Sequence, residues 1–132
     1  MYPVFQTRYG YPTGNCFAAC VASILEMRLE DVFDDSAIDR MGEDNSQWWD
    51  VWRTWLNERG YDLCAVRADA WFFPPKGYAL AGGKSKSNGV SHSVVTLDGK
   101  LAHDPHEGWD GLASVEDYVI IYPFNPAIRG KK

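Results

Sequence analysis

Three residues far apart in the chain carry side chains that could together supply a nucleophile, a base and an orienting carboxylate: Cys16, His92 and Asp104. A histidine in contact with a cysteine takes the thiol proton and later returns a proton to the leaving group. A carboxylate on the other ring nitrogen fixes the tautomer and orientation of the ring. The chemistry is attack of sulfur on a carbonyl carbon through an acyl-thioester, and it requires a fold that brings the three residues together.

Cys16 opens a segment, 16–25, whose apolar residues recur at the spacing of a buried helix. Asn15 stands at the N-cap position, so Cys16 is expected in the first turn of this helix. The backbone N–H groups there have no intrahelical acceptor, and the helix dipole is positive at this end. Both effects favour a thiolate over a thiol.

A second helix is expected from about 46 to 59, with its N-cap at Asn45 or Ser46 and its end at Gly60. Apolar side chains form a stripe along it at helical spacing: Trp48, Trp52, Trp55 and Leu56. Such a stripe is more often a core face than a ligand platform. Trp49 lies off the stripe and is therefore a candidate for lining a substrate groove.

After Gly60 the hydrophobic pattern becomes that of strands, over 61–67, 77–81, 91–97, 100–103 and 118–123. His92 then lies on one strand, and Asp104 directly follows the next. Helices first and strands after predict an α+β domain in which a central N-terminal helix packs on an antiparallel sheet. The Gly- and Ser-rich region 82–89 is interpreted as a mobile loop bordering the site.

The turn at Asp98-Gly99 decides whether His92 and Asp104 meet. As a two-residue turn it would place their side chains on opposite faces of the hairpin. A three-residue loop, with Gly99 supplying a bulge, would set them directly opposite each other on one face. Because the chemistry needs the two side chains in contact, we predict the three-residue or bulged form.

Three motifs occur in this order along the chain: GNCFAACV at 14–21, SHSVV at 91–95 and HDPH at 103–106. Together they resemble papain-like cysteine peptidases, most closely the double-glycine leader peptidases of bacteriocin exporters, and small stand-alone phage and bacterial proteins of that fold. The resemblance covers residues 6–105. It implies a papain-like fold, no cofactor, and the roles of nucleophile, base and orienting residue for Cys16, His92 and Asp104.

The same resemblance makes Gln6 the candidate oxyanion-hole donor, beside the backbone N–H of Cys16. Gln6 lies ten residues before the cysteine, farther than in the leader peptidases, so the loop from Thr7 to Asn15 must fold back for its amide to reach the site. Asn15 is the alternative donor. No transporter region accompanies the motifs, so the leader substrate of that family is not carried across.

Composition limits the other function classes. A chain of 132 residues predicts one domain over 1–132, with an N-terminal loop at 1–15 and a tail at 124–132. Thirteen Lys and Arg against eighteen Asp and Glu give a net charge of −5, which disfavours nucleic acid as a partner. The sequence has neither an apolar run of about 18 residues nor a signal peptide, so no membrane partner and a cytoplasmic location are expected. Oligomeric state is not indicated.

Three cysteines, an odd number, argue against a disulfide framework. Cys20 and Cys64 fall on faces that are expected to be buried, and both are interpreted as inert core residues. The residues around the candidate site include enough ligands for zinc: Cys16, His92, His103, Asp104 and His106. Their spacing is not that of a known zinc motif, so no metal is expected.

The sequence therefore predicts a thiol hydrolase acting on a peptide or protein substrate, at a peptide, isopeptide or other amide bond. Trp49, Trp71 and Ser91 are the candidates for its substrate groove. An acyl transferase would differ only in resolving the thioester with an amine instead of water. The alternative is a catalytically silent papain-fold protein that binds or inhibits a partner.

Overall fold

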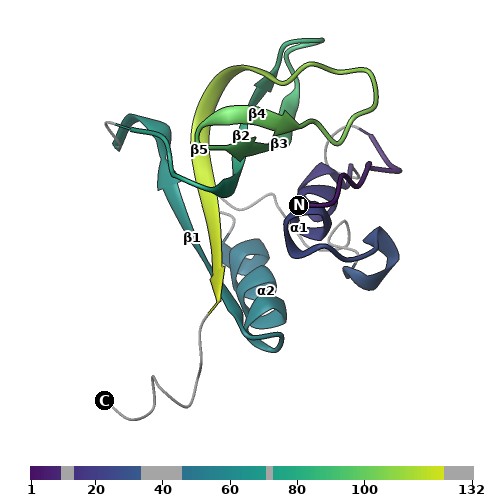
Figure 1. The fold of residues 1–132 in the computed structure, drawn as a ribbon, viewed down its shortest axis with the longest axis vertical. Coiled ribbons are helices and arrows are strands. Elements are labelled where there is room, and N and C mark those ends of the chain that lie inside the picture. The colour runs from purple at the N-terminus through teal and green to yellow at the C-terminus, as the bar shows by residue number, and fades with distance from the viewer. Residues whose placement is uncertain (10–13, 34–45, 71–72, 124–132) are drawn as a thin grey trace.

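The computed structural model describes residues 1–9, 14–33, 46–70 and 73–123. Two α-helices, α1 (Cys16–Leu25) and α2 (Ser46–Asn57), precede a five-stranded antiparallel sheet (Figure 1). The strands are β1 (Tyr61–Arg67), β2 (Tyr78–Ser85), β3 (Ser91–Leu97), β4 (Lys100–His103) and β5 (Leu112–Pro123), in the spatial order β1-β5-β2-β3-β4. The described residues also include two short 3₁₀ helices, η1 (Leu29–Asp31) after α1 and η3 (Ala68–Ala70) between β1 and β2. The predicted α+β class is confirmed.

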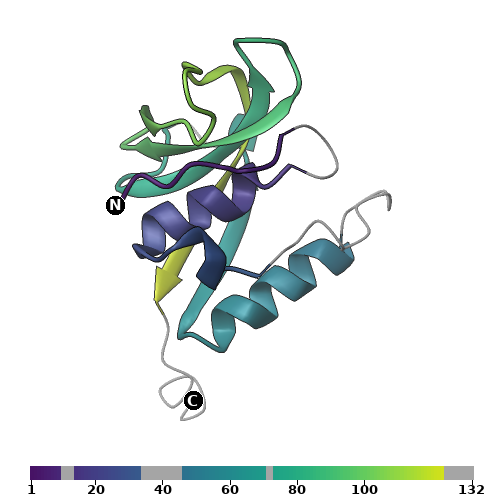
Figure 2. The same ribbon diagram turned by 90° about the vertical axis from the view of Figure 1, so that its right-hand side faces the viewer.

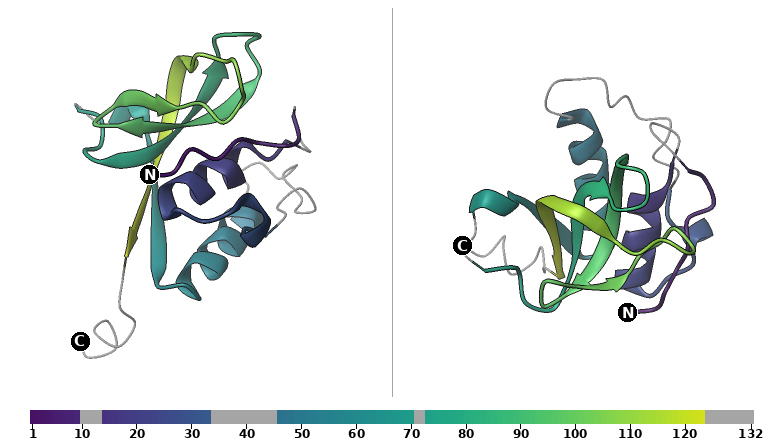
Figure 3. Two further views of the ribbon diagram at one scale, coloured as in Figure 1. Left: turned by 45° about the vertical axis from the view of Figure 1, so that its right-hand side comes forward. Right: turned by 90° about the horizontal axis from the view of Figure 1, so that it is seen from above.

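Both helices pack on the sheet through one hydrophobic core (Figure 3). On α2, Trp52 and Leu56 are fully buried, and Trp48 and Trp55 are at most 9% exposed, so the predicted apolar stripe is confirmed. Phe17 of α1 meets this stripe edge-on, with ring centroids 4.6 Å from Trp48 and 4.9 Å from Trp52. The sheet contributes Leu63, Leu80, Val95 and Val119.

Strand β2 is longer than predicted and takes in most of the region expected as a mobile loop, which corrects that prediction. Residues 82–85 belong to the strand, and only 86–90 form the connection to β3. Two glycines, which usually indicate a turn, lie in this strand, and the close approach of the β5 backbone requires one of them, Gly83. A Cβ on Gly83 would collide with the carbonyl oxygen of Ser114, and one on Gly82 would lie 2.5 Å from a carboxylate oxygen of Asp117.

Three further expectations differ from the structure. Helix α2 ends at Asn57 instead of 59. Strand β5 begins at Leu112 instead of 118, and its first half was missed because it shows no alternation of apolar and polar residues. Cys64 is exposed, because it follows the core residue Leu63 on the edge strand β1 and so points to the other face. Cys20 is fully buried, as predicted.

The hairpin of β3 and β4 has a two-residue turn, so the predicted three-residue loop is wrong. Asp98 and Gly99 have φ values of 52° and 83°, as a type I′ turn requires. A bulge is present, but it lies in β4 at Ala102, where the register between the strands shifts by one residue. One inserted residue reverses the facing of the side chains after it, and His92 and Asp104 therefore share a face.

Neither described helix has the length and apolar content needed to cross a membrane.

Candidate active site

Cys16 is the first residue of α1, as predicted, and its side chain is half-buried. Asn15 occupies the N-cap position, but its side chain does not cap the helix. Instead its Oδ1 accepts hydrogen bonds from the backbone N–H groups of Thr7 and Arg8, each at 3.0 Å, and its Nδ2 donates to Thr7 Oγ1 at 2.9 Å. These bonds fold the N-terminal segment back along the start of α1 (Figure 2).

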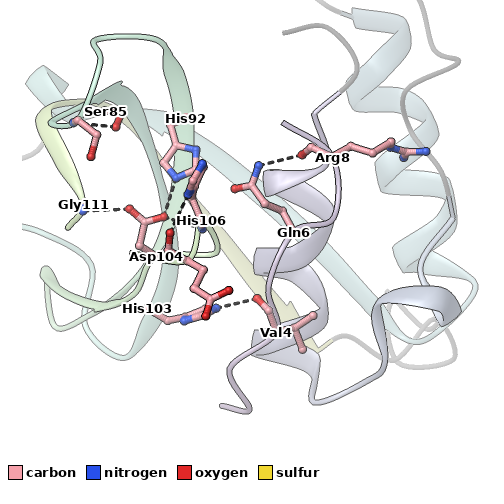
Figure 4. Close-up of polar contacts among 11 residues, drawn as sticks. Val4, Gln6, Arg8, Ser85, His92, His103, Asp104, His106 and Gly111 are labelled. Carbon is pink, nitrogen blue, oxygen red and sulfur yellow. Dashed lines mark hydrogen bonds and ion pairs between the residues drawn. The ribbon is translucent and has the colours of Figure 1, made fainter. Parts of the chain in front are cut away.

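His92 and Asp104 form a buried hydrogen bond, with 2.7 Å between Nε2 and Oδ1 (Figure 4). A carboxylate only accepts, so His92 Nε2 is the donor and Nδ1 is left for another partner. Cys16 lies beside His92 in the same cleft, and its side chain raises the pKa of the imidazole. The structure thus brings together the three residues that the sequence analysis singled out.

Asp104 is held by two more donors. The backbone N–H of His106 donates to Oδ1 at 2.8 Å, and that of Gly111 donates to Oδ2 at 2.9 Å. The loop after β4 therefore curls around the carboxylate and fixes both of its oxygens. A carboxylate held this way is well placed to orient an imidazole.

Charge and burial oppose each other in this cluster. Burial alone would lower the pKa of His92, but the hydrogen bond with Asp104 and the hydrogen bond and charge of Cys16 outweigh it and raise this pKa from 6.5 to about 9. Burial alone would raise the pKa of Asp104, but the hydrogen bonds from His92 and the loop backbone lower it below its usual value. Near neutral pH the site therefore favours an imidazolium beside an ionised carboxylate.

A ring stack supports His92 from the side of this loop. The rings of His106 and Trp109 lie parallel, with centroids 3.6 Å apart and planes 2° apart. Trp109 meets the ring of His92 nearly edge-on at 5.1 Å. The sequence analysis missed the role of His106 and Trp109. The signal available was their position directly after Asp104, in a segment with glycines at 108 and 111 that permit a tight loop.

Gln6 reaches the site because the N-terminal segment is tied to the end of β4. The backbone N–H of Gln6 donates to the carbonyl of Pro105 at 2.9 Å, and His103 Nε2 donates to the carbonyl of Val4 at 2.7 Å (Figure 4). Gln6 is 6% exposed and lines the cleft beside Cys16. Its Nε2 donates to the carbonyl of Arg8 at 2.9 Å, while its Oε1 has no hydrogen-bond partner. Asn15, the alternative donor, does not line the cleft.

The cleft, of about 260 Å³, lies between the start of α1, helix α2 and strands β2, β3 and β5. Trp49 and Ser91, two of the predicted groove residues, line it, whereas Trp71 lies outside the described residues. Glu116 and Asp117 also line the cleft and were not predicted, whereas Gly82 and Gly83 fall in the region 82–89 that was expected to border the site. Burial, and then the charge of Glu116, raise the pKa of the Asp117 carboxyl.

The other two cysteines differ from Cys16 in their surroundings. Burial, and then the charges of Cys16 and Asp104, raise the pKa of the Cys20 thiol well above its usual value, which makes this thiol a poor nucleophile. Cys64 lies on β1 and does not line the cleft. In the described part of the chain, no three His, Cys, Asp or Glu side chains are grouped so as to hold a metal ion.

No protein-family model, curated protein or solved structure matches this chain. Its function is therefore inferred from the geometry of the site.

Proposed function

We propose that this chain is a thiol hydrolase of papain-like type, which cleaves a peptide, isopeptide or other amide bond. One observation carries the proposal: Cys16, at the start of a helix, shares a cleft with a histidine whose pKa it raises and which a buried carboxylate orients. A nucleophile, a base and an orienting group in contact are the arrangement that acyl transfer to a cysteine requires.

In this mechanism the proton of the Cys16 thiol resides on His92, whose imidazolium form is favoured near neutral pH, and the sulfur attacks the carbonyl carbon of the amide. The carbon–nitrogen bond then breaks as His92 returns the proton to the leaving amine, leaving an acyl-thioester on Cys16. A water molecule, deprotonated by His92, attacks the thioester carbon. The carbon–sulfur bond breaks, the carboxylic acid leaves and the thiol is restored.

The negative charge on the carbonyl oxygen needs hydrogen-bond donors. We assign one to the backbone N–H of Cys16, because the first N–H groups of a helix have no intrahelical acceptor. The second is the Nε2 hydrogen of Gln6 that the carbonyl of Arg8 does not take, since a side-chain amide nitrogen carries two.

The test is covalent labelling with a peptide that carries an electrophile, followed by mapping of the modified cysteine by mass spectrometry. We expect Cys16 to be modified at pH 7, and Cys16→Ala to abolish both labelling and turnover of amide substrates. Cys64→Ala is the matched control, because Cys64 is a free, exposed cysteine far from His92 in the fold. Labelling that follows Cys64 instead of Cys16 would reject the mechanism.

A second candidate is a catalytically silent protein of the same fold that binds or inhibits a partner. It is favoured by the orientation of Gln6, whose nitrogen donates to Arg8 while its oxygen has no partner, so that the oxyanion hole is only partly formed. A silent protein would leave Cys16 no more reactive toward iodoacetamide than Cys64 at pH 7, and would turn over no amide.

A further inference from the structure

We propose that the cleft beside Cys16 selects a substrate with a cationic side chain, of lysine or arginine type, which the carboxylate of Asp117 holds with the help of Glu116. The inference rests on the proposed function and names the substrate class of that site.

The first support is a pair of carboxylates without a counter-ion. Glu116 and Asp117 both line the cleft, and among the described residues neither forms an ion pair. The nearest lysine along β2, Lys84, donates to Ser91 Oγ at 3.3 Å instead. Burial and then the charge of Glu116 raise the pKa of the half-buried Asp117, and the backbone hydrogen bond from Gly82 compensates its charge only in part. A cation brought by a ligand would supply that compensation.

The second support is independent of the carboxylates and comes from Gln6, which also lines the cleft. Gln6 is more than nine-tenths buried, and its Oε1 has no hydrogen-bond partner. Figure 4 shows this oxygen on the side of Gln6 that faces His92, while the nitrogen faces Arg8. A buried acceptor without a donor is costly, and a substrate N–H would satisfy it. The cleft therefore presents two acceptors, the amide oxygen of Gln6 and the carboxylate of Asp117, that a donor on the substrate would satisfy.

The residues that line the cleft suit a long aliphatic stem with a charged head. Trp48 and Trp49 of α2 line the cleft together with Gly82 and Asp117, and the Asp117 carboxylate lies over Gly82, where a Cβ would meet its oxygen at 2.5 Å. Lysine and arginine pack their methylene groups on apolar surface and direct the charged group to a polar one. Indole rings add attraction for a cation.

The test measures binding without chemistry, using full-length protein with Cys16→Ala. The probes are acetylated tripeptide amides in which one of the three positions carries arginine or its neutral isostere citrulline. Binding is followed by tryptophan fluorescence, since three tryptophans line the cleft, and by calorimetry. We expect arginine at one position to bind roughly tenfold more tightly than citrulline, in keeping with one charge-assisted hydrogen bond.

Substitutions in the same background test the assignment. Asp117→Asn keeps the shape of the side chain, and we expect it to bring the arginine-to-citrulline ratio close to one. Glu30→Gln removes an exposed carboxylate on η1, outside the cleft, and should leave the ratio unchanged. Thermal unfolding of each variant checks that the fold is retained. If Asp117→Asn does not fold, Glu116→Gln provides the test, with a smaller loss of the ratio.

Three outcomes would overturn the inference: no measurable binding of any arginine peptide, a ratio near one at every position, or a preference that survives both carboxylate substitutions. Labelling of wild-type Cys16 by electrophilic peptides separates this inference from the proposed function. Equal labelling by arginine and citrulline probes contradicts the charge selection alone. Selective binding of arginine peptides without any labelling of Cys16 contradicts the hydrolase alone.

Discussion

His92 Nε2 and Asp104 Oδ1 lie 2.7 Å apart, in a position where neither residue is more than 8% exposed. Asp104 also accepts two backbone hydrogen bonds, so the loop backbone holds the position of the carboxylate that orients the histidine. The orientation of the imidazole toward Cys16 therefore depends on the loop after β4 as much as on the strand that carries His92.

Asp104→Asn tests this dependence. The side-chain amide has a single acceptor oxygen, so it cannot accept from His92, His106 and Gly111 as the carboxylate does. We expect kcat/KM, or the second-order rate of probe labelling, to fall by about 10²-fold or more, and the free energy of unfolding to fall by about 1–3 kcal/mol. Asp98→Asn, at the exposed hairpin turn, is the control. Unchanged labelling by Asp104→Asn would remove Asp104 from the site.

The raised pKa of His92 predicts how stability depends on pH. Below about pH 6.5 the imidazole is protonated in the folded and the unfolded chain, so its stabilisation by Asp104 and Cys16 is fully present. Between pH 6.5 and about 9 the unfolded chain loses this proton while the folded chain keeps it, and stability falls. The loss is complete above about pH 9 and amounts to at most about 3 kcal/mol.

Urea unfolding at pH 6.0, 7.5 and 9.5 measures this dependence. We expect the midpoint to decrease across the series in the wild type and to change much less in His92→Gln. Since the pKa of Asp104 is lowered, its own contribution is lost only as the pH falls into the acidic range, outside this series. A wild-type midpoint that stays constant or rises between pH 6.0 and 9.5 would contradict the assignment of the charged pair.

His103 is expected to position Gln6 without contacting substrate. Its donation to the carbonyl of Val4 holds the N-terminal segment against β4, and its ring meets Phe5 edge-on at 4.9 Å. His103→Leu should lower the free energy of unfolding by about 1–3 kcal/mol, because the carbonyl loses its donor. If the segment also positions Gln6, kcat should fall while KM changes little. Leu101→Ala, an exposed substitution on the same strand, should change neither.

The sequence predicted the elements whose apolar spacing is regular. Helix α1 was predicted within its observed bounds, and the tryptophan stripe of α2 identified the face that packs on the core. The spacing of apolar residues did not predict the structure where the distance between two backbones determines it. Gly82 and Gly83 look like a loop in the sequence but lie in a strand, and at Gly83 the backbone of the neighbouring strand leaves no room for a Cβ. The periodicity of apolar residues indicates which face is buried, but it does not indicate how closely two backbones approach.

In the candidate site too, residue types predicted some features, whereas backbone geometry and packing determined the others. Residue type and order were enough to single out Cys16, His92 and Asp104, because few side chains can act as nucleophile, base and orienting group. The hairpin turn that joins His92 to Asp104 was predicted wrongly, since a bulge at Ala102 leaves no mark in the residue types. Glu116 and Asp117 were missed because acidic residues on a strand usually face solvent, and their place in the cleft depends on tertiary packing.

Gly83→Ala tests whether the close approach of β2 and β5 supports the cleft. The new methyl group would collide with the carbonyl oxygen of Ser114, so one of the two backbones must move. We expect a loss of about 3 kcal/mol or more in the free energy of unfolding, measured in urea, since overpacking against backbone is not relieved by a side-chain rotation. Gly108→Ala is the matched control: its Cβ would meet nothing within 4 Å, and only the positive φ of 83° is costly there, at about 1–2 kcal/mol.

Gly83 lines the cleft and pairs with His92 across β2 and β3, so the Gly83→Ala variant should also label more slowly at Cys16. Equal losses in the two variants would mean that β2 and β5 are not packed as closely as described, and the wall that carries Asp117 would then need a different explanation.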